Sequence, residues 1–427
     1  MNRSRSLPVL LPHIPSQRWS CHSCTRCCRE LVVHLFDSDR QTIDNLDLAR
    51  GLDRPAYVRL GSQWVLNQRD DGACVFLDPD GLCAIHRQHG INAKPVACRM
   101  FPFSVRPVRG AWQASLRFDC PTAAASKGEP LAESARGLED LLRDHAADER
   151  PDDGSVELVR GLRAAHEEFD QLVRHLTRWL NHNGRPLADR FIGAARITTT
   201  LAGATLDKVR GARFAELLDI LFDALPAELR DRPAPPSPRQ SGMLRQLVFA
   251  HAEHVSLAEM RGLGPRRLLH RWRQLRTARR FWRGHGEVPA LPQLDIRATF
   301  DRVEAVGPAA GDVHDVHNLL HRYVQARLSA RSAFGRGYYG WSILDGLTAL
   351  WLSLAVTGWL ARCHAASNGR DELTFDDVAR GVGTMDRGAT RLPALGALAE
   401  RARAAYLRRD DGLARLLARY LPVMESR

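Results

Sequence analysis

Eight cysteines within the first 120 residues constrain the fold of this 427-residue chain more than any other feature. Two-residue spacers separate the first three cysteines, and a fourth follows directly, in the run Cys21, Cys24, Cys27 and Cys28. The remaining four are Cys74, Cys83, Cys98 and Cys120. Thiolates are soft ligands that select zinc, copper(I) or iron–sulfur clusters. The pattern therefore predicts that all eight cysteines bind metal, because a set of buried free thiols does not account for adjacent cysteines.

The adjacency of Cys27 and Cys28 suggests how the ligands are divided. Neighbouring Cα atoms are ~3.8 Å apart and their side chains diverge, so the two sulfurs are expected to serve different centres or different atoms of one cluster. Bacterial ferredoxins use this two-residue spacing and end the run with a cysteine before proline, as Cys120 precedes Pro121. One hypothesis is a 4Fe–4S cluster on the first set of four cysteines and a second site on the other set, with His86 as a spare ligand. The first set is Cys21, Cys24, Cys27 and Cys120, and the second is Cys28, Cys74, Cys83 and Cys98. Zinc in four-thiolate sites is the alternative.

Hydrophobic patterns divide the chain into a cysteine-rich region, residues 1–125, and a helical remainder. Strand signals in the first region lie at Glu30–Leu35, Gln63–Leu66 and a hairpin of Phe103–Val108 with Trp112–Phe118. Helical periodicity follows at Leu131–His145, Val156–Leu180 and Phe214–Leu225. The proline-rich segment Pro226–Gly242 predicts a linker between a helical region at 126–232 and a helical C-terminal domain at 243–427. We expect an α+β protein in which a small metal-binding module precedes a larger, mainly α-helical part.

Neither a signal peptide nor a membrane span is predicted. Met1–Trp19 does not fit a secretory signal because Pro8 and Pro12 interrupt its apolar stretch. The longest uncharged run, Gly346–Ala361, falls short of the ~18 to 20 residues of a bilayer span and is expected to be a buried helix. We therefore expect a cytoplasmic protein without a transmembrane segment. Thiols stay reduced there, so clustered cysteines indicate metal or redox chemistry rather than disulfides.

The net charge of +12 is carried by arginine, since only three of the 61 basic residues are lysines, Lys94, Lys127 and Lys208. Nine arginines and no acidic residue occupy Arg261–Arg283. Apolar residues are predicted to form a helical stripe opposite these arginines, and they are Leu268, Trp272, Leu275, Ala278 and Trp282. Such a helix either packs on a core with a solvated arginine face, or docks on an acidic protein, nucleic acid or anionic lipid.

Four further patterns lie in the C-terminal half of the chain. Gly335–Gly340 matches G-x-G-x-x-G, but a helical pattern precedes it, so a turn between helices is favoured over a nucleotide site. His314, His317 and His321 share one helix face and form either a solvated stripe or a metal site. Cys363 ends the apolar run and is expected to be a buried thiol. Thr374 and Asp377 predict the capped start of a helix.

The cysteine-rich segment resembles the CxxCxxCC family of zinc- or iron-chelating proteins, to which flagellin lysine N-methylases belong. The likeness covers residues 17–121 and rests on three stretches besides the first cysteine run. They are Cys74-Val-Phe-Leu, Gly81-Leu-Cys83-Ala-Ile-His86 and Pro95-Val-Ala-Cys98-Arg-Met-Phe101-Pro102. A looser likeness to the helical region of the methylases covers His317–Tyr323 and Leu347–Leu360.

The resemblance implies an iron–sulfur cluster or another metal on the N-terminal cysteines. For the methylase branch it also implies methyl transfer from S-adenosylmethionine to lysine of a protein substrate. The first cysteines are more closely spaced here than in the methylases, so the metal inference transfers better than the reaction. We expect either a protein-lysine N-methyltransferase or a non-catalytic metal module whose helical part binds a partner. Nucleic acid is a less favoured partner for the basic helix.

Overall fold

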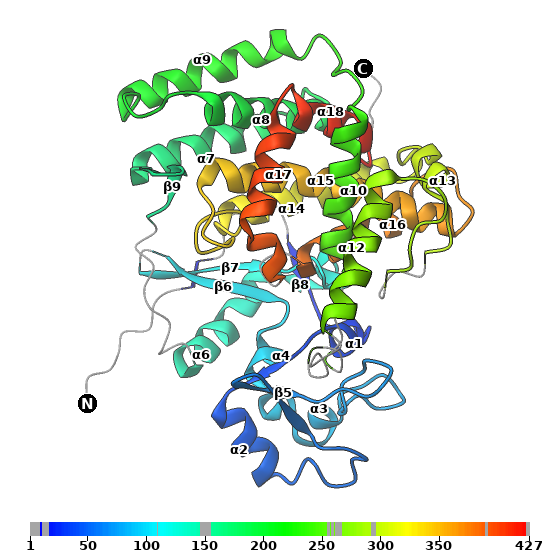
Figure 1. Cartoon of the computed structure of the whole chain (residues 1–427). Coiled ribbons are helices and arrows are strands. Elements are labelled where there is room, and N and C mark those ends of the chain that lie inside the picture. The colour runs from blue at the N-terminus through cyan, green and yellow to red at the C-terminus, as the bar shows by residue number, and fades with distance from the viewer. Residues whose placement is uncertain are drawn as a thin grey trace.

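The computed structural model describes residues 9–10, 17–108, 110–145, 155–253, 257, 260, 267–291, 296–388 and 392–423. A lower part of short strands and short helices carries eight of the nine cysteines, and packed helices form the body above it (Figure 1). The prediction of an α+β protein with a strand-containing cysteine module and a mainly helical remainder is confirmed.

A three-stranded antiparallel sheet supports the cysteine module. Its order is β3-β5-β4, and Val65 of the central strand pairs with both His34 and Val58. A small core lies beside the sheet and includes Leu66 and Phe76, against which three of the cysteines pack. The elements are β2 (Arg18–Trp19), α1 (Arg26–Glu30), β3 (His34–Leu35), α2 (Asp37–Asn45), β4 (Tyr57–Leu60), β5 (Gln63–Leu66), α3 (Ala84–His89), η1 (Ile91–Ala93) and α4 (Val96–Met100).

A hairpin of longer strands joins this module to the helical body. Strand β6 pairs antiparallel with β7, from Phe103 opposite Leu116 to Val108 opposite Ala111, and β1 runs parallel to β7. Ion pairing and hydrogen bonding tie the two parts, since Glu30 pairs with Arg387 and the Phe118 N–H donates to Asp386 at 2.6 Å. The elements are β1 (Val9–Leu10), β6 (Phe103–Val108), β7 (Ala111–Leu116), α5 (Pro121–Ala124), β8 (Glu129–Pro130), η2 (Leu131–Ser134) and α6 (Ala135–His145).

The helical body surrounds one long helix, α15. Trp351 and Trp359 of α15 have no exposed surface, and one hydrophobic core extends through the body from Phe118 to Val423. The elements are β9 (Glu157–Val159), β10 (Leu162–Arg163), α7 (His166–Leu180), α8 (Leu187–Gly203), α9 (Ala212–Glu228), α10 (Pro238–Ala252), α12 (Arg267–Arg283), α13 (Phe300–Ala305), α14 (Val313–Ser329), α15 (Ile343–Ser367), α16 (Phe375–Gly388), η3 (Pro393–Gly396), α17 (Leu398–Arg408) and α18 (Gly412–Tyr420).

Helix α15 is the one described helix whose length and composition would allow it to cross a membrane. However, 89% of its most apolar window is buried inside the protein, as in the core helix of a globular body. The prediction of a buried helix over Gly346–Ala361 is confirmed. Helix α18 approaches α15 so closely that a Cβ added at Gly358 would overlap the carbonyl oxygen of Tyr420.

Several predicted boundaries are wrong. The predicted strand Glu30–Leu35 is confirmed only at its end, because α1 includes Glu30. The helix predicted over Val156–Leu180 begins at His166, and a short β9–β10 hairpin precedes it, where Gly161 adopts a positive φ of 83°. The linker predicted at Pro226–Gly242 is shorter, since α9 continues to Glu228 and α10 begins at Pro238.

The apolar stripe predicted for the basic helix is partly wrong. Trp272 and Leu275 face solvent, whereas Ala278 packs against the core of the body and Trp282 lies against Gly242 of α10. The side chain of Leu268 lies outside the described residues.

Two predictions in the C-terminal half are confirmed. Gly335–Gly340 is a turn between α14 and α15, with the Gly335 N–H donating to the Trp341 carbonyl at 2.7 Å. Helix α16 begins where the Thr374 and Asp377 pair predicted, and the Thr374 N–H donates to the Asp377 carboxylate at 2.9 Å.

Three histidines of the helical body predict that acid destabilises the fold. Burial lowers the pKa of His251 to about 3, and those of His321 and His364 to about 4, from 6.5. The unfolded chain takes up a proton near pH 6.5, so the stability is fully present above that pH and is lost as the pH falls toward 4. We expect the free energy of unfolding to fall by roughly 2 kcal/mol per histidine between pH 7 and pH 5.

Urea titrations at several pH values would measure this loss. The substitution His364→Gln should remove about one third of the change in the free energy of unfolding between pH 7 and pH 5, because it removes one of the three buried imidazoles. An unchanged slope in that variant would contradict the assignment of the buried imidazole as one of its sources.

Candidate metal centre

Four separate segments bring five cysteines to one place in the cysteine module. Helix α1 carries Cys27 and Cys28, the loop after β5 carries Cys74, Cys83 precedes α3, and α4 carries Cys98. Backbone hydrogen bonds fix these segments to one another. The Cys74 N–H donates to the Cys28 carbonyl at 2.7 Å, and Leu77 pairs with Cys83 as an antiparallel bridge.

A buried carboxylate positions the helix that carries Cys98. One oxygen of Asp39 accepts the N–H of Val96, the first residue of α4, at 2.9 Å, and the other accepts the N–H of Phe36 at 2.9 Å. Asp39 is only 6% exposed, so the hydrogen bonds that connect α2 to the start of α4 are shielded from water. The local fold therefore presents Cys98 from a fixed backbone.

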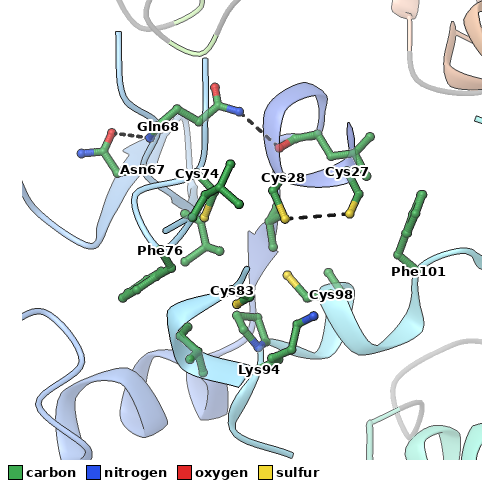
Figure 2. Close-up of a pocket in the computed structure, with 17 residues that line it drawn as sticks. Cys27, Cys28, Asn67, Gln68, Cys74, Phe76, Cys83, Lys94, Cys98 and Phe101 are labelled. Atoms are coloured by element: carbon green, nitrogen blue, oxygen red, sulfur yellow. Dashed lines mark hydrogen bonds between the residues drawn. The ribbon is translucent and has the colours of Figure 1, made fainter. Parts of the chain in front are cut away.

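The five cysteines line a cavity of about 60 Å³, which we call the thiol pocket. Figure 2 shows the sulfurs lying around a common space, together with the ammonium group of Lys94. The Sγ atoms of Cys27 and Cys28 are 3.9 Å apart. Apolar side chains make up most of the remaining wall, and they are Leu31, Val33, Leu66, Phe76, Leu77, Ile85, Pro95, Ala97 and Phe101.

The surroundings raise the pKa of three of the five thiols, which favours the protonated form of Cys27, Cys74 and Cys98. The contact with the Cys28 thiol, followed by burial, raises the pKa of Cys27. Burial raises the pKa of Cys74 to about 11 and also raises the pKa of Cys98. Metal ligands must be thiolates, so binding of a metal here releases protons.

Lys94 is a member of the site that sequence analysis missed. Burial works against its charge, but the sulfurs of Cys83 and Cys98, and then those of Cys28 and Cys27, raise its pKa above the ordinary value. A cation among thiolates offsets part of their negative charge. The one signal in the sequence that could have identified it is the rarity of lysine in this chain, since one of only three lysines lies between Cys83 and Cys98.

The other three predicted ligands lie around a second, more open cavity of about 380 Å³, which we call the outer basin. Cys21 and Cys24 are exposed there, and Cys120 is 5% exposed. Four cysteines line both cavities, Cys27, Cys28, Cys83 and Cys98, whereas Cys74 lines only the thiol pocket. His86, the spare ligand of the hypothesis, also lines the outer basin.

Within the described residues, no three cysteine, histidine or acidic side chains are close enough to hold one metal ion as they stand. This applies to the histidine stripe of α14 as well, where His317 instead contacts Arg190 at 3.0 Å. Cys363 has no exposed surface, so the prediction of a buried thiol is confirmed.

Comparison with known proteins supports metal binding by the cysteine module. Residues 20–122 match the CxxCxxCC family model, described as "Putative zinc- or iron-chelating domain". No curated protein and no solved structure matches the chain. The matched segment begins one residue before Cys21 and ends two residues after Cys120, so it includes all eight predicted ligands. The family model therefore matches the segment that carries all eight predicted ligands, and its description supports the binding of zinc or iron there.

Proposed function

We propose that the thiol pocket binds an iron–sulfur cluster of the 4Fe–4S type. The observation that carries this proposal is the arrangement of five sulfurs around a space larger than one ion. A site for a single water needs ~10–15 Å³, and the thiol pocket measures about 60 Å³. In a cluster, each thiolate binds its own iron, so the ligands stand farther apart than around one zinc ion.

The chemistry of the donor set fits such a cluster. Cysteine thiolates are the usual ligands of iron–sulfur clusters, and four of them hold a 4Fe–4S centre. Cys28, Cys74, Cys83 and Cys98 would supply these four ligands. Cys21, Cys24, Cys27 and Cys120 at the outer basin then remain for a second site. The two sets of four are those of the sequence hypothesis, but that hypothesis placed the 4Fe–4S cluster on the set that now remains, and the proposal places it on the other.

The residues of the pocket would control the access of water to a bound cluster, the charge around it and its reduction potential. The apolar wall excludes water, and the Lys94 ammonium lowers the cost of gathering several thiolates. When bound, a cluster supplies one-electron transfer, with a potential that depends on burial, charge and hydrogen bonds to sulfur. Lys94 and the apolar wall are the parts of this chain that would tune it.

Purification under anaerobic conditions would test the proposal. We expect brown protein with about four irons and four sulfides for each cluster, and Mössbauer or EPR spectra of a 4Fe–4S centre. Colourless protein with stoichiometric zinc would replace the cluster by a four-thiolate zinc site. Protein that binds neither metal would overturn metal binding by the thiol pocket.

Methyl transfer from S-adenosylmethionine to lysine of a protein substrate is a finer proposal that rests on the resemblance alone. The substrate amine would have to lose a proton against an ordinary pKa of about 10.4, and no residue of this chain is assigned to that step. Incubation with labelled S-adenosylmethionine and candidate proteins tests it. Label in protein lysine supports the enzyme, whereas failure to bind the cofactor supports a non-catalytic metal module that binds a partner.

A further inference from the structure

Helix α12 exposes three large apolar side chains on the surface of the helical body. Leu269, Trp272 and Leu275 are 64%, 68% and 67% exposed. Because they are three residues apart, they form one oblique band across the outward face of the helix. The inward face holds α12 on α10, where Arg245 donates to the carbonyl of Phe281 at 2.9 Å. The apolar band is therefore not needed to attach the helix to the body.

A second band, made of arginines, runs parallel to the first. Each of Arg273, Arg276 and Arg279 lies four residues beyond a member of the apolar band and is exposed. Helix α12 contains no acidic residue, and none of these three arginines pairs with a carboxylate of the described residues. Arg280 and Arg283 continue the exposed basic surface.

We propose that α12 docks on the surface of an anionic phospholipid bilayer. A bilayer presents an apolar layer beneath a layer of phosphates, and the outward face of α12 offers a partner for each. The apolar band faces the acyl chains, and the long side chains of the neighbouring arginines reach the phosphates. A guanidinium group can bind a phosphate through two parallel N–H···O hydrogen bonds, and tryptophan is favoured at the membrane interface. Leu269, Trp272 and Leu275 enter the boundary of the acyl chains, while the arginines bind the headgroups.

Other polyanions account for only part of this face. The phosphates of nucleic acid would match the arginines, but they leave exposed leucines without an apolar partner. An acidic protein would need a groove complementary to both bands, whereas any anionic bilayer supplies both layers. The charge and the apolar band together therefore favour the membrane.

Co-sedimentation of the full chain with large unilamellar vesicles would test the proposal. At about 0.1 M salt, we expect at least tenfold stronger binding to vesicles of about 70:30 phosphatidylcholine and phosphatidylglycerol than to pure phosphatidylcholine. The triple variant Arg273→Gln, Arg276→Gln, Arg279→Gln should lose about tenfold or more of that binding. The triple variant Leu269→Ala, Trp272→Ala, Leu275→Ala should show a similar loss.

Matched variants control for charge and apolar area. The exposed arginines of α7 and α9 give Arg174→Gln, Arg178→Gln, Arg213→Gln, with the same change in net charge. Ile220→Ala with Leu398→Ala removes exposed apolar surface elsewhere, 59% and 72% exposed respectively. Neither control should weaken vesicle binding more than twofold.

Three outcomes would overturn the proposal. The first is equal binding to the two kinds of vesicle. The second is weaker vesicle binding by the arginine variant but not by the apolar variant, which would show that only non-specific electrostatic attraction is involved. The third is binding to a short DNA duplex or to polyglutamate without binding to anionic vesicles, which would assign the face to nucleic acid or to an acidic protein. The metal content of the thiol pocket is measured separately and does not affect this test.

Discussion

Replacement of Cys98 by alanine should remove the metal from the thiol pocket. Cys98 enters the pocket from α4, whose start is fixed by Asp39, and no other cysteine lies on that helix. Loss of a residue that merely orients a ligand weakens metal binding by about 10–100-fold, so loss of a ligand should lower the affinity by at least that factor. Metal analysis and absorbance spectra of the purified variant would measure the effect.

Cys363→Ala is the matched control for this substitution. Its thiol is fully buried, but it lies in α15, within the helical core. The control should retain the wild-type metal content. Full metal content in Cys98→Ala would contradict the assignment of this cysteine as a ligand, whereas a loss in both variants would indicate a general folding defect.

Cys21→Ser would test the division of the ligands between the two cavities. Cys21 is exposed and lines only the outer basin. If the thiol pocket is a complete site by itself, its spectrum should survive this change. A loss equal to that of Cys98→Ala would instead place both cysteines on one centre.

Among alanine substitutions of the described glycines, Gly358→Ala should cause the largest fall in the free energy of unfolding. A methyl group at this position of α15 would overlap the backbone carbonyl of Tyr420, and a backbone atom cannot move aside as a flexible side chain can. Helices α15 and α18 would have to separate. Overpacking of a core typically costs about 1–3 kcal/mol, and the backbone contact places this variant at about 3 kcal/mol or more. Urea unfolding monitored by circular dichroism would measure the change.

Gly203→Ala is the corresponding control, because a Cβ there meets no atom within 4 Å. Gly203 is the last residue of α8, so alanine should leave the free energy of unfolding unchanged or raise it by about 0.5–1 kcal/mol. Equal stability of the two variants would contradict the close approach of α15 and α18.

The cysteine spacing predicted which residues form the candidate site, but it did not predict how they are arranged within it. Motif spacing identifies the eight cysteines as a set, but the pocket that contains Cys74 depends on a backbone hydrogen bond to Cys28, 46 residues earlier in the chain. Such a contact leaves no local periodicity in the sequence. Lys94 escaped prediction for the same reason, since its role depends on sulfurs from other segments.

The errors in the helical part have local causes. Leu162 lies four residues after Leu158 and three after Val159, spacings that favour a helix, although these residues form the β9–β10 hairpin. Pro226 predicts the start of a linker, but it lies within the last turn of α9. For α12, hydrophobicity alone could not show which face meets α10, because Trp272 and Phe281 are both aromatic and only Phe281 is buried.

The separation of the hydrophobic cores has a consequence for how the molecule responds to chelators. The core beside the thiol pocket is small and includes Leu66 and Phe76, whereas the helical core extends from Phe118 to Val423 without it. A metal centre held by Cys28, Cys74, Cys83 and Cys98, as proposed, would cross-link 71 residues of chain, inclusive of both ends, much as a disulfide would. Removal of the metal should therefore unfold the small cysteine module first, while the helical body stays folded. Loss of iron or zinc would then cause local unfolding rather than unfolding of the whole protein.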